Sequence, residues 1–195
     1  HLHSEYSLLD GACRIKELVL RVKELGQKAV AVTDHGNMFA AVEFYNECLV
    51  QGIKPIIGCE VYVAPRTRFD KLAKIDSSPY HLVLLCENNE GYQNLIKLVS
   101  AAYTEGFYSK PRVDIELLEK YHKGLICLSA CLAGEIPRKL INGDYEGAKQ
   151  TALRYRDIFG RDNYFIELQN HKFADQQRIL PLLIKLSHET GIPMV

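Results

Sequence analysis

Histidine and acidic side chains stand close together at the start of this sequence. His1 and His3 open the chain, and Asp10 follows in the tripeptide Leu9-Asp10-Gly11. Successive side chains of an extended segment point to opposite faces, so His1 and His3 point the same way and can bind one cation. Two histidines in a terminal segment are also common without a metal, so the interpretation depends on whether the pattern recurs.

Residues of the same chemical types flank three later apolar segments. These segments read KAVAVTDHG, PIIGCE and HLVLLC, and they present His35, Glu60 and His81. Each residue alone has an ordinary structural interpretation, but their joint occurrence indicates a metal site. Imidazole and carboxylate ligands suit Zn²⁺, Mn²⁺ or Fe²⁺ better than Mg²⁺. Ligands for more than one ion predict a cluster that generates hydroxide and stabilises the attacking and leaving oxygens of a phosphoester.

The elements that position these residues alternate between strand and helix. Short continuous apolar runs are typical of strands buried on both faces, and apolar residues three and four apart are typical of amphipathic helices. We predict strands near 28–33, 55–59, 82–86, 124–130, 164–168 and from 192 onward, and helices near 14–25, 37–50, 90–103, 114–121, 134–141, 144–159 and 174–190. This α/β order favours a barrel with its site at the strand ends, and a doubly wound sheet is the alternative.

Length and composition indicate one domain with a neutral charge balance. The chain has 195 residues, and its hydrophobic fraction of 47% can furnish a substantial core. Its 24 basic and 24 acidic residues cancel, so DNA binding would depend on a local patch or on other domains. The six cysteines form no paired motif and read as reduced thiols. No signal peptide or membrane-length apolar run is evident, so we expect a cytoplasmic location without membrane contact.

The longest stretch without regular periodicity covers residues 64–80. It contains Arg66, Arg68, Lys71 and Lys74 beside two aspartates. Loops of this length are usually functional or mobile. Two interpretations stay open, namely a nucleic-acid contact in which Arg66 and Arg68 bind substrate, and a solvated insertion.

Several motifs, in order along the chain, resemble the PHP (polymerase and histidinol phosphatase) domain family. They are HLHSEYSLLDG, TDHGN, GCEVYV, YHLVLL and LSACLAGE. The tract from Ala64 to Ser100 is most similar to the PHP domains of bacterial replicative DNA polymerases. The resemblance covers residues 1–195 as one domain. It implies a distorted (β/α)7 barrel, truncated at both ends, with up to three metal ions at its mouth.

The resemblance also implies which residues bind metal. By position they are His1, His3, Asp10, His35, Glu60, His81 and Cys131. In the phosphatase branch histidine commonly replaces Asp10 and Cys131, so the metal preference here can differ. The family's last ligands form an Asp-x-His pair after the strand that begins at Ile192, and we expect the chain to end before it. Asp34 is expected to orient an imidazole, and His171 is a weaker candidate near the mouth.

Two classes of function follow from the resemblance. In the first, the domain is a metal-dependent phosphoesterase that uses Zn²⁺, Mn²⁺ or Fe²⁺ and acts as a proofreading 3′–5′ exonuclease. Its partners would be the primer 3′ end and, through the full polymerase, the remaining polymerase domains and replisome subunits. In the second, it is a catalytically silent module braced by metals. A stand-alone histidinol-phosphate phosphatase is less favoured, because the tract from Ala64 to Ser100 has no reason to appear there.

Overall fold

The computed structural model describes all residues, 1–195, as a mixed α/β structure with six strands and seven helices. In chain order the elements are α1 (Ile15–Glu24), β1 (Ala29–Val32), α2 (Ala41–Gln51), β2 (Lys54–Val63), β3 (Tyr80–Cys86), α3 (Asn89–Thr104), β4 (Arg112–Val113), α4 (Ile115–Tyr121), β5 (Leu125–Leu128), α5 (Glu135–Ile141), α6 (Tyr145–Phe159), β6 (Tyr164–Phe165) and α7 (Ala174–Thr190). Every predicted helix is confirmed. The short strand β4 was not predicted, and the strand expected from Ile192 is reduced to a bridge between Ile166 and Met194.

The sheet is mixed, whereas the sequence predicted parallel strands. Its order is β1-β2-β3-β5-β6, with β4 beside β2. The pairs β1–β2, β2–β4 and β5–β6 are parallel, but β3 runs antiparallel to both β2 and β5. A parallel neighbour requires a crossover connection, usually a helix. No helix lies between β2 and β3, so the chain turns back and β3 takes the opposite direction.

Strand β2 changes partner halfway along its length. Residues 54–57 pair with β1, and residues 58–63 pair with β3. The change occurs at Gly58, where an added Cβ would lie 2.6 Å from the Leu84 carbonyl oxygen. Only glycine therefore allows the two strands to approach this closely. The result is one long strand that pairs with β1 over its first half and with β3 over its second half.

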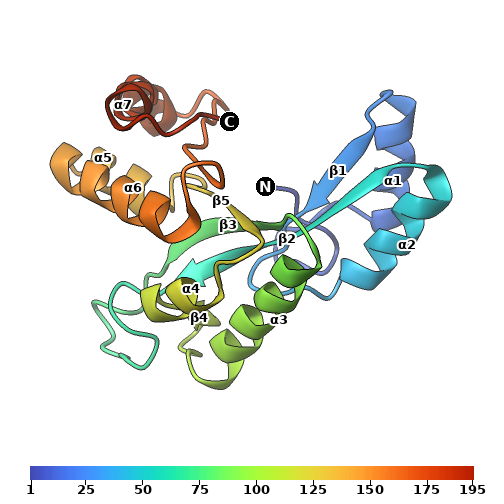
Figure 1. Cartoon of the computed structure of the whole chain (residues 1–195), viewed down its shortest axis with the longest axis horizontal. Coiled ribbons are helices and arrows are strands. Elements are labelled where there is room, and N and C mark those ends of the chain that lie inside the picture. The colour runs from blue at the N-terminus through green and yellow to red at the C-terminus, as the bar shows by residue number, and fades with distance from the viewer.

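Helices surround the sheet in two groups with separate apolar cores. The larger core joins β2, β3 and β5 to helices α3–α7, and the smaller one joins β1 to α1 and α2. Figure 1 shows α1 and α2 at one end of β2, the group α5, α6 and α7 at the other side of the sheet, and the N-terminus between them. None of the seven helices combines the length and apolar character that a membrane crossing demands.

Segments outside the named strands extend both edges of the sheet. Leu2 exchanges hydrogen bonds with Thr33, just after β1, at 2.8 and 2.9 Å. Ile166, just after β6, likewise bonds Pro193 and Val195 at 2.9 and 3.0 Å. No strand pairing joins β1 to β6. The sheet topology therefore establishes the α/β fold but not a closed barrel.

The connection between β2 and β3 is fixed to the body of the protein by Arg112. This side chain is fully buried in β4. Its guanidinium donates to the carbonyl oxygens of Gly106, Arg68, Asp70 and Asp76, at 2.9 to 3.2 Å. One side chain thus satisfies several carbonyl groups of an irregular segment, which explains how the segment holds its shape without secondary structure.

Arg112→Met should lower the free energy of unfolding by about 2–4 kcal/mol, because several carbonyl oxygens lose their donor in the interior. Urea unfolding followed by circular dichroism measures this change. Arg161 is exposed and has no side-chain partner, so Arg161→Met is the matched control and should have little effect. Equal losses in the two variants would contradict the structural role of Arg112.

Candidate metal centre

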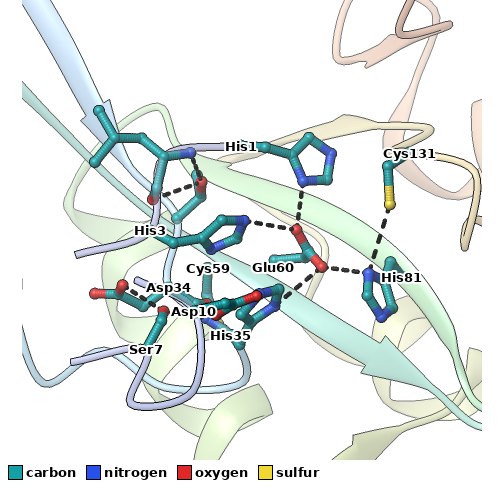
Figure 2. Close-up of polar contacts among 12 residues, drawn as sticks. His1, His3, Ser7, Asp10, Asp34, His35, Cys59, Glu60, His81 and Cys131 are labelled. Carbon is teal, nitrogen blue, oxygen red and sulfur yellow. Dashed lines mark hydrogen bonds and ion pairs between the residues drawn. The ribbon is translucent and has the colours of Figure 1, made fainter. Parts of the chain in front are cut away.

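The carboxylate of Glu60 lies at the centre of a histidine cluster. Glu60 is 0% exposed and belongs to β2. The Nδ1 atoms of His1 and His81 contact its two oxygens directly. His35 Nδ1 lies 3.2 Å away and His3 Nε2 3.4 Å away. Figure 2 shows the four imidazoles pointing toward this one carboxylate.

Two further predicted ligands complete the cluster at its periphery. Cys131 Sγ lies 3.6 Å from His81 Nδ1, and Asp10 Oδ2 lies 3.0 Å from His35 Nε2. The structure therefore brings all seven predicted ligands into one connected group. Within it, two sets have donor atoms that all lie within 4.8 Å of one another, namely His1-Glu60-Cys131 and His3-His35-Glu60.

Strand directions explain why residues so far apart in sequence meet here. His35 follows β1, and its segment is held by bonds from Gly36 N to Glu60 O and from Glu60 N to Asp34 O. His81 lies near the start of β3, opposite Tyr62. Because β3 is antiparallel to β2, its first residues lie beside the last residues of β2. The sequence had suggested that Glu60 follows the end of its strand. In the structure it lies inside β2.

Asp34 does not contact an imidazole, which corrects the role predicted for it. Its buried carboxylate accepts hydrogen bonds from Ser4 N at 2.6 Å, Ser4 Oγ at 2.7 Å and Ser7 Oγ at 2.7 Å. Ser7 Oγ in turn accepts from His35 N at 3.1 Å. Asp34 thus fixes the backbone of the loop that carries His3 and Asp10.

Glu167 belongs to the cluster although it was not among the predicted ligands. Its Oε1 lies 3.4 Å from His1 Nε2, and its Oε2 is buried without a hydrogen-bond partner. The backbone N–H of Glu167 donates to Ser129 Oγ, which holds the residue in place. A signal for it was present in the sequence, because Glu167 directly follows the apolar run 164–166, as Glu60 follows a similar run.

Three other predicted residues lie outside the cluster. His171 is exposed, and its backbone N–H donates to Gln176 Oε1. Arg68 is 7% exposed, and its guanidinium contacts the carboxylates of Asp114, Glu105 and Glu116 at 2.7 to 3.0 Å. Arg66 binds Asp76 through two nitrogens. The contacts of both arginines serve the irregular segment itself and give no support to substrate binding.

The cluster has unpaired polar atoms of the kind that a cation would satisfy. His3 Nδ1, His35 Nδ1 and both Glu60 oxygens are buried and make no hydrogen bond. The Glu60 oxygens are within ion-pair distance of imidazole nitrogens but accept no regular hydrogen bond. Unpaired buried polar atoms are rare in folded proteins. Imidazole, carboxylate and thiol groups together are the donors of a transition-metal site, so these residues fit such an ion.

Burial and mutual contacts shift the pKa values of the cluster in opposite directions. Burial opposes ionisation of Glu60, but the contacts with His1, His35 and His81 outweigh it and hold its pKa well below the usual range. Burial also opposes a charge on His1, yet Glu167 and Glu60 raise its pKa to about 10. Burial and the neighbouring His35 lower the pKa of His3. The carboxylate is therefore ready to bind cations, and a metal would compete with protons for the imidazoles.

A pocket opens beside the cluster. Its volume is about 410 Å³, and Asp10, His35 and His81 form part of its wall. The side chain of Asp10 is 59% exposed, while the histidines are mostly covered. A small ligand in this pocket would therefore meet the candidate metal centre directly.

Comparison with known proteins adds independent information. Residues 1–171 match the PHP domain family. The whole chain is 53% identical to a DNA polymerase III subunit alpha of Treponema pallidum and 48% identical to that of Deinococcus radiodurans, of which it spans only 17% and 15%. An amidohydrolase structure from Chromobacterium violaceum, with bound sulfate and no metal, aligns with 98% of this chain and 83% of its own, at 15% identity and a TM-score of 0.59. That likeness concerns the fold.

Asp34→Asn should loosen the loop that carries His3 and Asp10, because at least one serine loses its acceptor. We expect a loss of about 1–3 kcal/mol in unfolding free energy, the usual cost of an unsatisfied buried polar group. Faster hydrogen exchange of the Ser4 amide should accompany it. Asp162 is exposed and without a partner, so Asp162→Asn is the control. Unchanged exchange at Ser4 would show that Asp34 does not hold this loop.

Proposed function

Because the chain belongs to the PHP domain family, we propose that it works as the metal-dependent phosphoesterase domain of a bacterial DNA polymerase III alpha subunit. The observation that carries this proposal is the buried Glu60 carboxylate with four histidines directed at it. The identity to alpha subunits over the whole chain supports the polymerase context.

Two donor sets that share Glu60 would hold the metal ions. His1, Glu60 and Cys131 form one set, and His3, His35 and Glu60 form the other. We propose Zn²⁺ or Mn²⁺, with Fe²⁺ as a third possibility, because imidazole and thiolate donors suit these ions better than Mg²⁺. When bound, such ions would polarise a phosphoryl oxygen and lower the pKa of water.

Residues around the candidate metal centre hold its ligands in position and connect it to the pocket. Asp34 and the serines fix the loop that carries His3 and Asp10, and the Gly36–Glu60 bond fixes His35. His35 lies between two carboxylates, with Nδ1 toward Glu60 and Nε2 toward Asp10. A neutral imidazole can donate its proton to only one of them. His35 therefore bridges Asp10, on the pocket wall, and the buried carboxylate of Glu60.

The finer form of the proposal is a 3′–5′ exonuclease that acts on a primer terminus. Its support is the similarity to DNA polymerase III alpha subunits and the pocket beside the candidate metal centre. The chain has no net charge, so duplex DNA would be held by other parts of the polymerase. Those parts and further replisome subunits are the proposed partners.

A structural role is the second candidate, and one contact favours it. His1 from the first segment lies 3.4 Å from Glu167, which follows β6. A metal bound by His1 would therefore join the two edges of the sheet. The same contact supports our proposal that the fold is a distorted barrel of the (β/α)7 type, with residues 1–195 forming one domain.

Metal analysis tests the ligand set. Purified without chelator, the chain should contain Zn²⁺, Mn²⁺ or Fe, and His3→Ala, His35→Ala or Glu60→Gln should lower the metal content, because each removes a donor. The matched controls are His122→Ala, His188→Ala and Glu119→Gln, which lie outside the cluster. Elemental analysis after reconstitution measures the content. Equal losses in ligand and control variants would show that the ligands are misassigned.

Hydrolysis assays separate the two candidate functions. The metal-loaded chain should hydrolyse bis(4-nitrophenyl) phosphate and a labelled oligonucleotide. Glu60→Gln should reduce the rate by more than about 100-fold, since even residues behind the ligands cost up to that much in metal sites. A fully loaded chain that is inactive on both substrates, but gains thermal stability from the metal, would replace the enzymatic proposal with the structural one.

A further inference from the structure

One lysine lines the pocket beside the candidate metal centre and has no acidic partner. Lys110 is half-buried, and no carboxylate lies within 4.0 Å of its ammonium group. Its Nζ stands 5.3 Å from the centre of the Tyr62 ring. The ammonium therefore has no acidic group to neutralise it, and it lies at a pocket that can admit an anion.

Tyr62 connects Lys110 to the histidines of the cluster. The Tyr62 ring stacks on His35, with centroids 6.3 Å apart and an interplanar angle of 16°. It meets His81 edge-on, with centroids 5.2 Å apart. The hydroxyl of Tyr62 has no hydrogen-bond partner in the protein. Lys110, Tyr62 and the two imidazoles therefore form one continuous wall of the pocket.

The backbone next to this wall is shaped to hold it. Gly36 has φ +61°, and a Cβ there would lie 3.0 Å from Tyr62 Cε2 and 2.9 Å from Pro111 Cγ. Glycine thus permits Tyr62 and the segment of Lys110 to approach the loop of His35. This close packing fixes Pro111, the residue after Lys110, against the loop of His35.

Electrostatics select the kind of ligand that fits between these groups. Lys110 carries a positive charge, and the nearby histidine cluster would carry more when it binds metal ions. Like charges in a partly buried pocket repel one another unless an anion lies between them. A phosphate can accept from the ammonium while its other oxygens face the cluster, and charge-assisted bonds of this type are strong.

The rim of the pocket includes exposed apolar side chains. Leu8 and Leu9 are 90% and 92% exposed, and Phe39 is 67% exposed. Tyr103 lines the same pocket. Apolar side chains that face solvent beside a polar centre suit a flat organic group, and aromatic rings stack on nucleobases. The pocket therefore offers a charged side for a phosphate and an apolar side for a base.

We propose that Lys110 anchors the phosphate of a single nucleotide unit, whose base rests on the rim formed by Leu8, Leu9 and Phe39. Lys110 is a positioning residue here, since it holds the phosphate against the candidate metal centre. The inference rests on the proposed phosphoesterase function and names its substrate unit. It requires binding but no turnover, so binding alone can test it.

Calorimetric titration of the zinc-loaded chain with thymidine monophosphate and with inorganic phosphate provides the test. Lys110→Gln should weaken binding of both ligands about 10-fold or more, since a bond to a charged group is lost. Lys110→Arg keeps the charge and should retain most of the affinity. Lys16, exposed on α1 and without an acidic partner, supplies the control Lys16→Gln, which should bind as the original chain does. Metal content and circular dichroism should be unchanged throughout.

A second comparison tests the apolar rim. The double variant Leu8→Ser with Leu9→Ser should weaken thymidine monophosphate but leave inorganic phosphate unaffected. An equal effect on both ligands would overturn the assignment of the base. Unchanged binding in Lys110→Gln, or no binding of either ligand to the original chain, would overturn the role of Lys110.

These binding experiments test the role of Lys110 separately from the phosphoesterase proposal. If the chain binds the nucleotide through Lys110 but hydrolyses no phosphodiester, the enzymatic proposal fails and the role of Lys110 is supported. If the chain hydrolyses phosphodiesters and Lys110→Gln leaves KM unchanged, the enzymatic proposal is supported and the role of Lys110 is overturned.

Discussion

The structure depends on burying the carboxylate of Glu60 in the middle of a strand. A carboxylate removed from water without partners costs several kcal/mol, so the protein must supply compensating groups. Here the groups are imidazoles from the first segment, from the loop after β1 and from the start of β3. These segments must therefore converge on β2, and the contacts of Asp34 with Ser4 and Ser7 hold the first of them there. Figure 2 shows this convergence.

Strand β2 separates the chemistry of the protein from its core. Side chains alternate between the faces of a strand. Cys59, Val61 and Val63 belong to the larger apolar core, whereas Glu60 and Tyr62 face the histidines. One face thus secures the strand by hydrophobic packing, and this rigid strand keeps the polar face in a fixed geometry. Glu60 and His81 are thus positioned by the sheet, and the other donors reach them from loops that are held by hydrogen bonds, which favours defined positions for the donors.

The donor cluster and the neighbouring pocket place different demands on the protein. The cluster is largely covered and gathers negative charge and imidazoles for a cation. The pocket is open, partly apolar, and has Lys110 on its wall. A metal that only stabilised the fold would require the donor cluster but not the pocket. The presence of the pocket beside the cluster favours chemistry on a small anionic ligand over a purely structural role.

The sequence by itself predicted the helices and most strands, and its resemblance to the PHP family indicated the seven candidate ligands. Helices and strands follow local apolar periodicity, and the ligands stand in short motifs such as TDHGN and GCE. Local patterns did not give the direction of β3, because that depends on its pairing across the sheet, although the irregular stretch 64–80 already lacked a crossover helix. The partners of Asp34, about 30 residues away in sequence, depend on the same long-range packing. Only the tertiary structure placed Glu60 inside β2, added Glu167 to the cluster and set Lys110 against Tyr62, because each of these contacts joins segments that meet only when the sheet forms.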